Sequence, residues 1–153
     1  MADGSDEPVA WLTGEEQGIW RRLLAAEFQL RDRLDQELRK GHGISLGDYA
    51  VLVNLSEAPG WSLRMSDLAD RILLSRSGLT RRVDAMAQKG LVTRRSCPAD
   101  GRGALAELTP AGEELLRQAA PTHVAGVRRY LIDAIGSLEG LASGLEKVLE
   151  RLS

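Results

Sequence analysis

The sequence has few of the residues that most metal and redox sites require. It contains one cysteine and two histidines among 153 residues. Because Cys97 stands alone, an internal disulfide and a zinc site built from several thiolates are both excluded. His42 and His123 have neither i, i+4 spacing nor a cysteine partner, so they are weak evidence for a metal site. We therefore expect no metal and no cofactor.

Long apolar runs are also missing. No stretch approaches the roughly 20 apolar residues that cross a bilayer, and the N-terminus does not combine a basic start with an apolar run. We predict a cytoplasmic protein that has no membrane contact. The sequence shows no glycine-rich phosphate loop, no metal triad and no nucleophile with an evident histidine partner, so we expect no enzymatic activity.

A net positive charge occurs in only one part of the chain. Residues 1–63 carry 6 basic and 11 acidic side chains, residues 64–102 carry 9 and 4, and residues 103–153 carry 5 and 7. The net charge of the whole chain is -2. The middle segment alone has a basic balance, which makes it the candidate for contact with phosphates.

The N-terminal third predicts a long helix. After an acidic arm, Thr13 is a candidate N-cap, and apolar residues recur at helical spacing from Glu15 to about Lys40. Ser45 is predicted to cap a second, short and buried helix. Because the long helix is apolar on more than one side, it needs more than one neighbour.

The C-terminal third also predicts helices. Thr109 and Pro110 are suited to the N-cap and first position of a helix, which we expect to kink at Pro121. Ser137 is predicted to start a last helix with leucine and valine at helical spacing. Such terminal helices would leave a large apolar patch exposed in a monomer, which indicates a homodimer.

The middle segment has the pattern of a helix-turn-helix followed by a hairpin. Residues 63–65 are a short strand candidate, and Ser66 and Ser75 are candidate N-caps of two short helices. Residues 91–96 and 103–109 are strand-like and flank a turn-rich stretch, so they predict a β-hairpin. We expect a mostly α protein of about six helices with a small three-stranded β wing.

The second short helix has two different faces. Leu79, Val83 and Met86 form an apolar stripe, whereas Ser77, Thr80, Arg81, Asp84 and Gln88 lie on the opposite side. Arg81 can donate two hydrogen bonds to guanine, and Thr80 can offer a methyl group to thymine. Gly78 would let the helix approach DNA closely. These residues predict a recognition helix in a major groove.

Other residues are predicted to hold that helix on the DNA backbone. Arg76 and Arg82 lie on the flanks of the polar stripe and are aimed at phosphates, with Ser75 at the N-cap. The alternative is a solvated basic face on a surface helix, which is what most charge runs are. The neighbouring basic hairpin favours the DNA interpretation.

The hairpin also contains basic residues that predict a contact with DNA. Arg94 and Arg95 lie on its first strand, and Arg102 follows Asp100 by two residues. A carboxylate at that spacing can orient a guanidinium, and a narrow minor groove attracts such an arginine. We predict that Arg102 probes the minor groove, and the alternative is a surface ion pair that stabilises a turn.

Together these segments resemble the multiple antibiotic resistance regulator (MarR) family of winged helix-turn-helix proteins. The resemblance covers nearly the whole chain and rests on LA at 68–69, SGLTRRVD at 77–84, KGLV at 89–92, DGR at 100–102 and LTPAG at 108–112. Gly103 departs from the basic or polar residue that many relatives carry there, which reduces the charge of the wing.

The resemblance implies a division of the single chain into three parts. Residues 1–44 would form an arm and dimerisation helix, residues 45–110 the DNA-binding lobe, and residues 111–153 the C-terminal dimerisation helices. It also implies a homodimer on an inverted-repeat operator in double-stranded DNA. The usual outcome in the family is repression that a small aromatic or phenolic ligand relieves.

Four residues are candidates for an effector site. Trp20 could stack on an aromatic ligand and Arg21 could anchor its carboxylate, and Trp11 and Tyr49 are the other two candidates. The alternative is that these aromatics pack in the core or at the dimer interface. Cys97 could serve as a redox sensor, but it has no second cysteine to resolve an oxidised thiol, so incidental placement is favoured.

Two other classes of function compete with a DNA-binding regulator. A winged helix can be a docking module for proteins without binding DNA, but such a module would not need arginines on the groove-facing stripe. Catalysis is the remaining alternative, and no constellation of residues in the sequence supports it.

Overall fold

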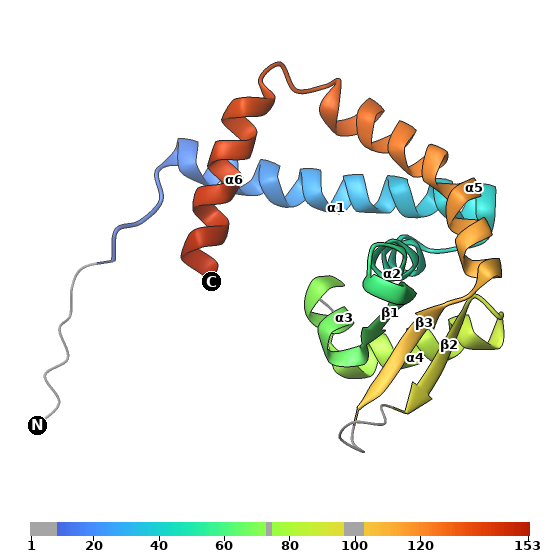
Figure 1. Cartoon of the computed structure of the whole chain (residues 1–153). Coiled ribbons are helices and arrows are strands. Elements are labelled where there is room, and N and C mark those ends of the chain that lie inside the picture. Colours follow the sequence, from blue (N-terminus) through green and yellow to red (C-terminus); the bar gives the residue numbers. More distant parts are fainter. Residues whose placement is uncertain (1–8, 73–74, 97–102) are drawn as a thin grey trace, which may run out of the picture.

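The computed structural model describes residues 9–72, 75–96 and 103–153 (Figure 1). The helices are α1 Gly14–His42, α2 Leu46–Ser56, α3 Met65–Ile72, α4 Arg76–Gln88, α5 Pro110–Val127 and α6 Leu138–Leu152. The strands are β1 Ser62–Arg64, β2 Val92–Ser96 and β3 Ala104–Leu108. They form one antiparallel sheet in the order β1-β3-β2. The predicted mostly α fold with a three-stranded wing is confirmed.

Most helix starts are set by the predicted caps. Thr13 and Glu16 form a capping box at α1, and Ser45 and Asp48 form another at α2. The side chains of Ser75, Thr109 and Ser137 cap α4, α5 and α6. Ser66 is an exception, because α3 begins at Met65 directly after β1 and leaves no loop residue for a cap.

One core holds the lobe that contains α2, α3, α4 and the sheet. Its residues are largely aliphatic and include Leu52, Leu55, Leu68, Leu79, Val83, Met86, Val92 and Ala106. Leu38 near the end of α1 and Ala119 in α5 belong to the same cluster. The lobe is therefore fixed to the ends of two helices that continue beyond it (Figure 1).

Helices α1 and α5 pack side by side. A Cβ atom on Gly126 would lie 2.6 Å from the Leu34 side chain, so glycine permits this close approach. The Tyr130 hydroxyl donates a hydrogen bond of 2.6 Å to Glu37 of α1. Helix α5 continues through Pro121, where the sequence predicted a kink, and a π-helical turn over Arg128–Ile132 follows it.

Apolar residues remain exposed on the parts that project from the lobe. They lie along the arm and the N-terminal half of α1, and along α6, and comprise Trp11, Leu12, Ile19, Trp20, Leu23, Leu24, Phe28, Leu138, Leu145, Val148, Leu149 and Leu152. No described helix is long and apolar enough to cross a membrane.

Candidate nucleic-acid interface

Helix α4 has the two faces that its sequence predicted. Leu79 and Val83 are fully buried and Met86 nearly so, which anchors one side in the core. Ser77 and Arg81 are exposed on the other side. The Thr80 hydroxyl donates to the Arg76 carbonyl at 2.9 Å, so its methyl group is the part left for a partner. The helix therefore presents a short polar surface from a rigid base.

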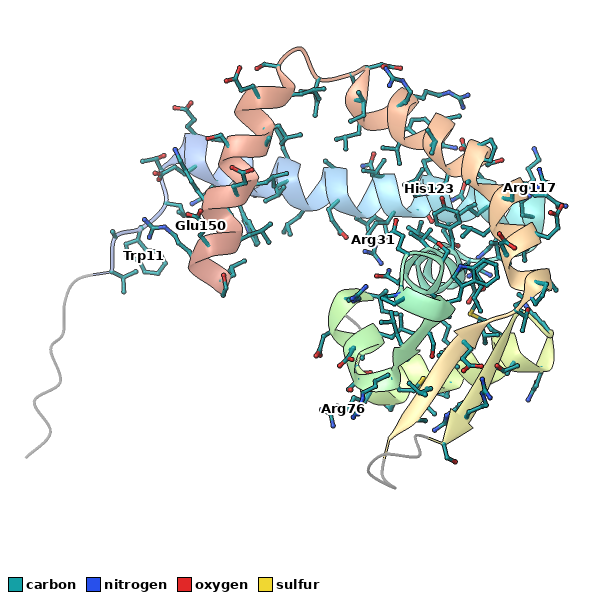
Figure 2. All side chains as sticks on the ribbon, in the orientation of Figure 1. Trp11, Arg31, Arg76, Arg117, His123 and Glu150 are labelled. Carbon is teal, nitrogen blue, oxygen red and sulfur yellow. The ribbon has the colours of Figure 1, made fainter. Side chains whose placement is uncertain are left out.

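Arg76 and Arg81 are the cations that α4 leaves available. Both side chains are exposed, and within the described residues neither guanidinium has a hydrogen bond or ion pair. Figure 2 shows Arg76 projecting on the side of the lobe away from α1. Two unpaired guanidinium groups in the first two turns of a capped helix can bind an anion or a base edge without first breaking a contact.

Arg82 lies differently from the prediction. Its Nη1 atom donates to Ser45 Oγ at 2.8 Å and to Asp48 Oδ1 at 2.7 Å, and its side chain is 29% exposed. The position of Arg82 on the flank of the polar stripe predicts a phosphate contact, and no local sequence pattern connects Arg82 to Asp48. The capping box at residues 45–48 was visible in the sequence, but its contact with α4 depends on how the helices pack.

The β2–β3 hairpin holds its described arginines with carboxylates. Arg94 pairs with Asp84 of α4 at 3.1 Å, which connects the hairpin to α4. The Arg95 guanidinium donates from Nε and Nη2 to the Glu107 carboxylate across the sheet. Both arginines remain substantially exposed, so these pairs orient them without removing them from solvent. Asp100, Arg102 and Cys97 lie outside the described residues.

Two acidic groups beside α4 are held in the ionised form. Burial raises the pKa of Asp48, but hydrogen bonds from the Ser45 backbone and the Arg82 guanidinium outweigh it and leave the pKa below its ordinary value. Asp35 behaves in the same way, with Arg39 and the Leu46 backbone as its donors. Both carboxylates therefore carry negative charge at neutral pH.

The four predicted effector residues do not meet within one chain. Tyr49 is buried and its ring lies 4.4 Å from the His123 ring, centroid to centroid. Trp11 and Trp20 are exposed, and so is Arg21. Trp20 lies roughly 27 Å along α1 from Leu38, the residue of that helix that shares the core with Tyr49.

A cavity of about 490 Å³ opens instead where α1 meets the lobe. Phe28, Asp35 and Arg39 of α1 line it from one side, and Asn54, Arg71 and Arg82 from the other. Its wall mixes one aromatic ring with charges of both signs. None of the described residues form a group of three or more histidine, cysteine, aspartate or glutamate side chains that could hold a metal ion.

Comparison with known proteins places this geometry in a family. Residues 42–103 match the MarR family. The chain is similar to the HTH-type transcriptional regulator MhqR of Bacillus subtilis (strain 168), with 32% identity over 105 residues, or 69% of this chain and 70% of that protein.

Solved structures are similar to this chain over a greater part of its length. AbsC, a MarR family transcriptional regulator from Streptomyces coelicolor, has 40% identity and a TM-score of 0.87 over 94% of this chain and 98% of its own. Sco3205 from the same organism, solved in complex with DNA, has 39% identity and a TM-score of 0.88 over 94% of each chain. These relatives are regulators rather than enzymes, in agreement with the sequence-based expectation. The chain belongs to the MarR family of DNA-binding transcriptional regulators.

Proposed function

We propose that the protein represses transcription as a homodimer that binds an inverted repeat in double-stranded DNA. The observation that carries this proposal is the pair of exposed, unpaired arginines, Arg76 and Arg81, on the solvent face of a helix whose other face is in the core. In a two-fold dimer, two copies of α4 about one DNA turn apart would enter successive major grooves. Such a protein acts in the cytoplasm, where the operator is.

The contacts divide into base reading and positioning. Arg81 reads guanine, while Ser77, Gly78 and Thr80 allow close approach. Arg76 and the Ser75 N-cap region bind phosphate, together with Arg94 and Arg95 of the hairpin. Asp100 and Arg102 are proposed for the minor groove on sequence alone. Arg82 is not assigned to phosphate, because its guanidinium already binds Ser45 and Asp48.

The dimer is proposed from the exposed apolar residues. Leu149 is 64% exposed and Leu152 77%, and they lie on the same helix as Leu145 and Val148. A monomer rarely exposes a continuous apolar patch of this kind. A second copy supplies matching surface, so residues 1–44 and 111–153 are proposed as the dimerisation segments and residues 45–110 as the DNA-binding lobe. Trp11 and Trp20 belong to this interface in our proposal.

The effector site is proposed at the cavity between α1 and the lobe. Its size suits a small aromatic or phenolic molecule, with Phe28 for stacking and Arg39 or Arg71 for an acidic group. A ligand there would relieve repression only if it binds more tightly to a lobe orientation that does not fit the operator.

The competing function is a winged helix that docks proteins and does not bind DNA. Footprinting on the DNA that flanks the protein's own gene separates the two. We expect a protected region containing two half-sites related by a two-fold axis and spaced by about one helical turn. Absence of protection at low ionic strength, where phosphate contacts are strongest, would favour the docking module.

A further inference from the structure

The Arg82 side chain forms a polar clamp between α4 and the start of α2. We use "the Arg82 clamp" for Arg82 together with Ser45, Gly47 and Asp48. One guanidinium nitrogen donates both to Ser45 Oγ and to Asp48 Oδ1. The Nε atom is buried and has no partner among the described residues. An arginine that leaves Nε unpaired is held in place by contacts at the far end of its side chain.

Gly47 shows how closely the guanidinium approaches the helix. A Cβ atom at this position would lie 2.5 Å from Arg82 Cζ and 2.7 Å from both terminal nitrogens. Any side chain at residue 47 would therefore displace the guanidinium. The absence of a Cβ atom at Gly47 leaves the space that the Arg82 guanidinium occupies.

The same turn of α2 is also tied to α1. The Leu46 backbone N–H donates to Asp35 Oδ1 at 2.8 Å, and Asp35 also binds Arg39. Asp48 completes the arrangement by accepting from the Ser45 backbone N–H at 3.0 Å. The first turn of α2 thus connects the long helix α1 to the recognition helix α4 through directional contacts.

Direction matters because α4 contacts the core through apolar side chains, and its other ion pair, Asp84 with Arg94, lies on the side of the hairpin. The hydrophobic contribution of Leu79, Val83 and Met86 is non-directional, so a small rotation of the helix costs little of it. Arg81 is adjacent to Arg82, so a small rotation at one moves the other. A hydrogen-bonded ion pair at one point of the helix removes that freedom.

We propose that Arg82 is a positioning residue that sets the orientation of α4 for DNA through Gly47 and Asp48 and does not itself contact DNA. This inference rests on the DNA-binding function proposed above. For one variant, positioning and simple electrostatics predict opposite changes in DNA affinity. Loss of the Asp48 charge in Asp48→Asn should strengthen DNA binding if only charge mattered, whereas positioning predicts that binding weakens.

Gly47→Ala is the sharpest test, because it changes no charge. Alanine in a helix is otherwise favourable relative to glycine, so a loss can be assigned to the displaced guanidinium. The probe is a duplex that the wild-type protein selects from a random-sequence library. We expect Gly47→Ala and Asp48→Asn each to weaken binding roughly tenfold, with an unchanged dependence on salt. The matched control is Gly41→Ala in α1, where a Cβ atom would meet nothing within 4 Å.

A double variant tests whether the effect passes through the guanidinium. In the Arg82→Ala background, Gly47→Ala should cause no further loss. Hydrogen exchange of the α4 backbone amides gives a second reading that needs no DNA, and we expect faster exchange in Gly47→Ala than in Gly41→Ala. Circular dichroism confirms that each variant is folded.

The outcomes separate the clamp from the proposed function. If Arg82→Ala lowers the salt slope by about one while Gly47→Ala binds and exchanges like wild type, Arg82 contacts phosphate and the clamp is refuted. If the wild-type protein selects no duplex, the DNA-binding function fails, and the exchange of α4 alone then decides whether the clamp holds the helix.

Discussion

Arg81 and Arg82 are neighbours in the chain, but a rotation of about 100° around α4 gives them different surroundings. Arg81 is exposed without a partner, whereas Arg82 turns toward α2 and binds Ser45 and Asp48. In our proposal, the same residue type reads DNA at one position and positions the helix at the next. What distinguishes them is whether a carboxylate lies within reach, and α2 supplies it.

His123 predicts how stability responds to mild acid. Its Nδ1 atom is buried without a partner among the described residues, and burial lowers its pKa below the ordinary value of 6.5. The unfolded chain therefore takes up the proton more readily, so stability is lost as pH falls from about 6.5 toward the folded pKa. We expect the thermal midpoint to fall between pH 7 and pH 5, and His123→Phe to reduce that fall.

The carboxylates act in a different pH window and serve as an internal control. Asp35 and Asp48 have lowered pKa values, so their contribution is complete above about pH 5 and is lost only in stronger acid. Thermal unfolding followed by circular dichroism at several pH values separates the two windows. Equal slopes for wild type and His123→Phe between pH 7 and pH 5 would show that His123 is not the responsible group.

At the scale of single residues, the sequence predicted which face of a helix a side chain lies on better than it predicted which residue that side chain contacts. The apolar stripe of α4 and its Ser75 cap followed from helical spacing and cap chemistry, and the structure confirms both. The partner of Arg82 did not follow, because Asp48 is 34 residues away and reaches it only through packing. The Arg95 and Glu107 pair was hidden for the same reason, since it depends on the register of two strands.

At the scale of elements, the N-terminal end of α5 packs against the turn that follows α4. Thr109 donates from its backbone to Leu91 and from its hydroxyl to Gly90, at 3.2 Å and 2.6 Å. A Cβ atom on Gly112 would lie 2.1 Å from the Leu91 carbonyl oxygen. Because that obstacle is backbone, it cannot move aside without disturbing the start of β2.

Gly112→Ala should therefore destabilise the fold. We expect a loss of about 1–3 kcal/mol in the free energy of unfolding, measured by urea denaturation. Gly41→Ala is the control, because an added methyl group there meets open space and alanine favours a helix. If the two variants unfold at the same urea concentration, the close contact of α5 with Leu91 has been overstated.

The extents of the elements were predictable where caps and periodicity agree. The expected helix from Glu15 to about Lys40 is observed as Gly14–His42, and the hairpin strands fall within the expected stretches. Sequence alone did not predict the π-helical turn after Val127, which depends on how α5 meets α1. It also misplaced the start of α3, because a strand that runs directly into a helix leaves no cap signal.

At the scale of the whole molecule, dimer formation is the proposal with the broadest consequence. Leu149→Lys would bury a charge in an apolar interface, so we expect the dimer dissociation constant to rise at least about tenfold. Sedimentation velocity measures this change. Ser143→Lys adds the same charge to an exposed position of α6 outside the leucine and valine series and should leave the dimer intact. Identical sedimentation of both variants would place the interface elsewhere.

The arrangement of the elements separates the proposed DNA surface from the proposed dimer surface. The lobe and the projecting parts of α1 and α6 lie at different places in the molecule (Figure 1), so the proposed DNA surface and the proposed dimer surface do not compete. The cavity lies between them, against the first turn of α2. A ligand there would touch Arg82 and Asp35, which are the residues that connect α1 to the recognition helix.

The central claim is that the exposed face of α4 reads DNA sequence through Arg81. The direct measurement is equilibrium binding of wild type, Arg81→Ala and Arg95→Ala to the selected duplex and to a scrambled duplex of equal length, at several salt concentrations. We predict that Arg81→Ala loses about 1–3 kcal/mol of discrimination between the duplexes, while Arg95→Ala weakens binding to both equally and reduces the salt slope by about one. Equal loss on both duplexes for both variants would contradict the claim.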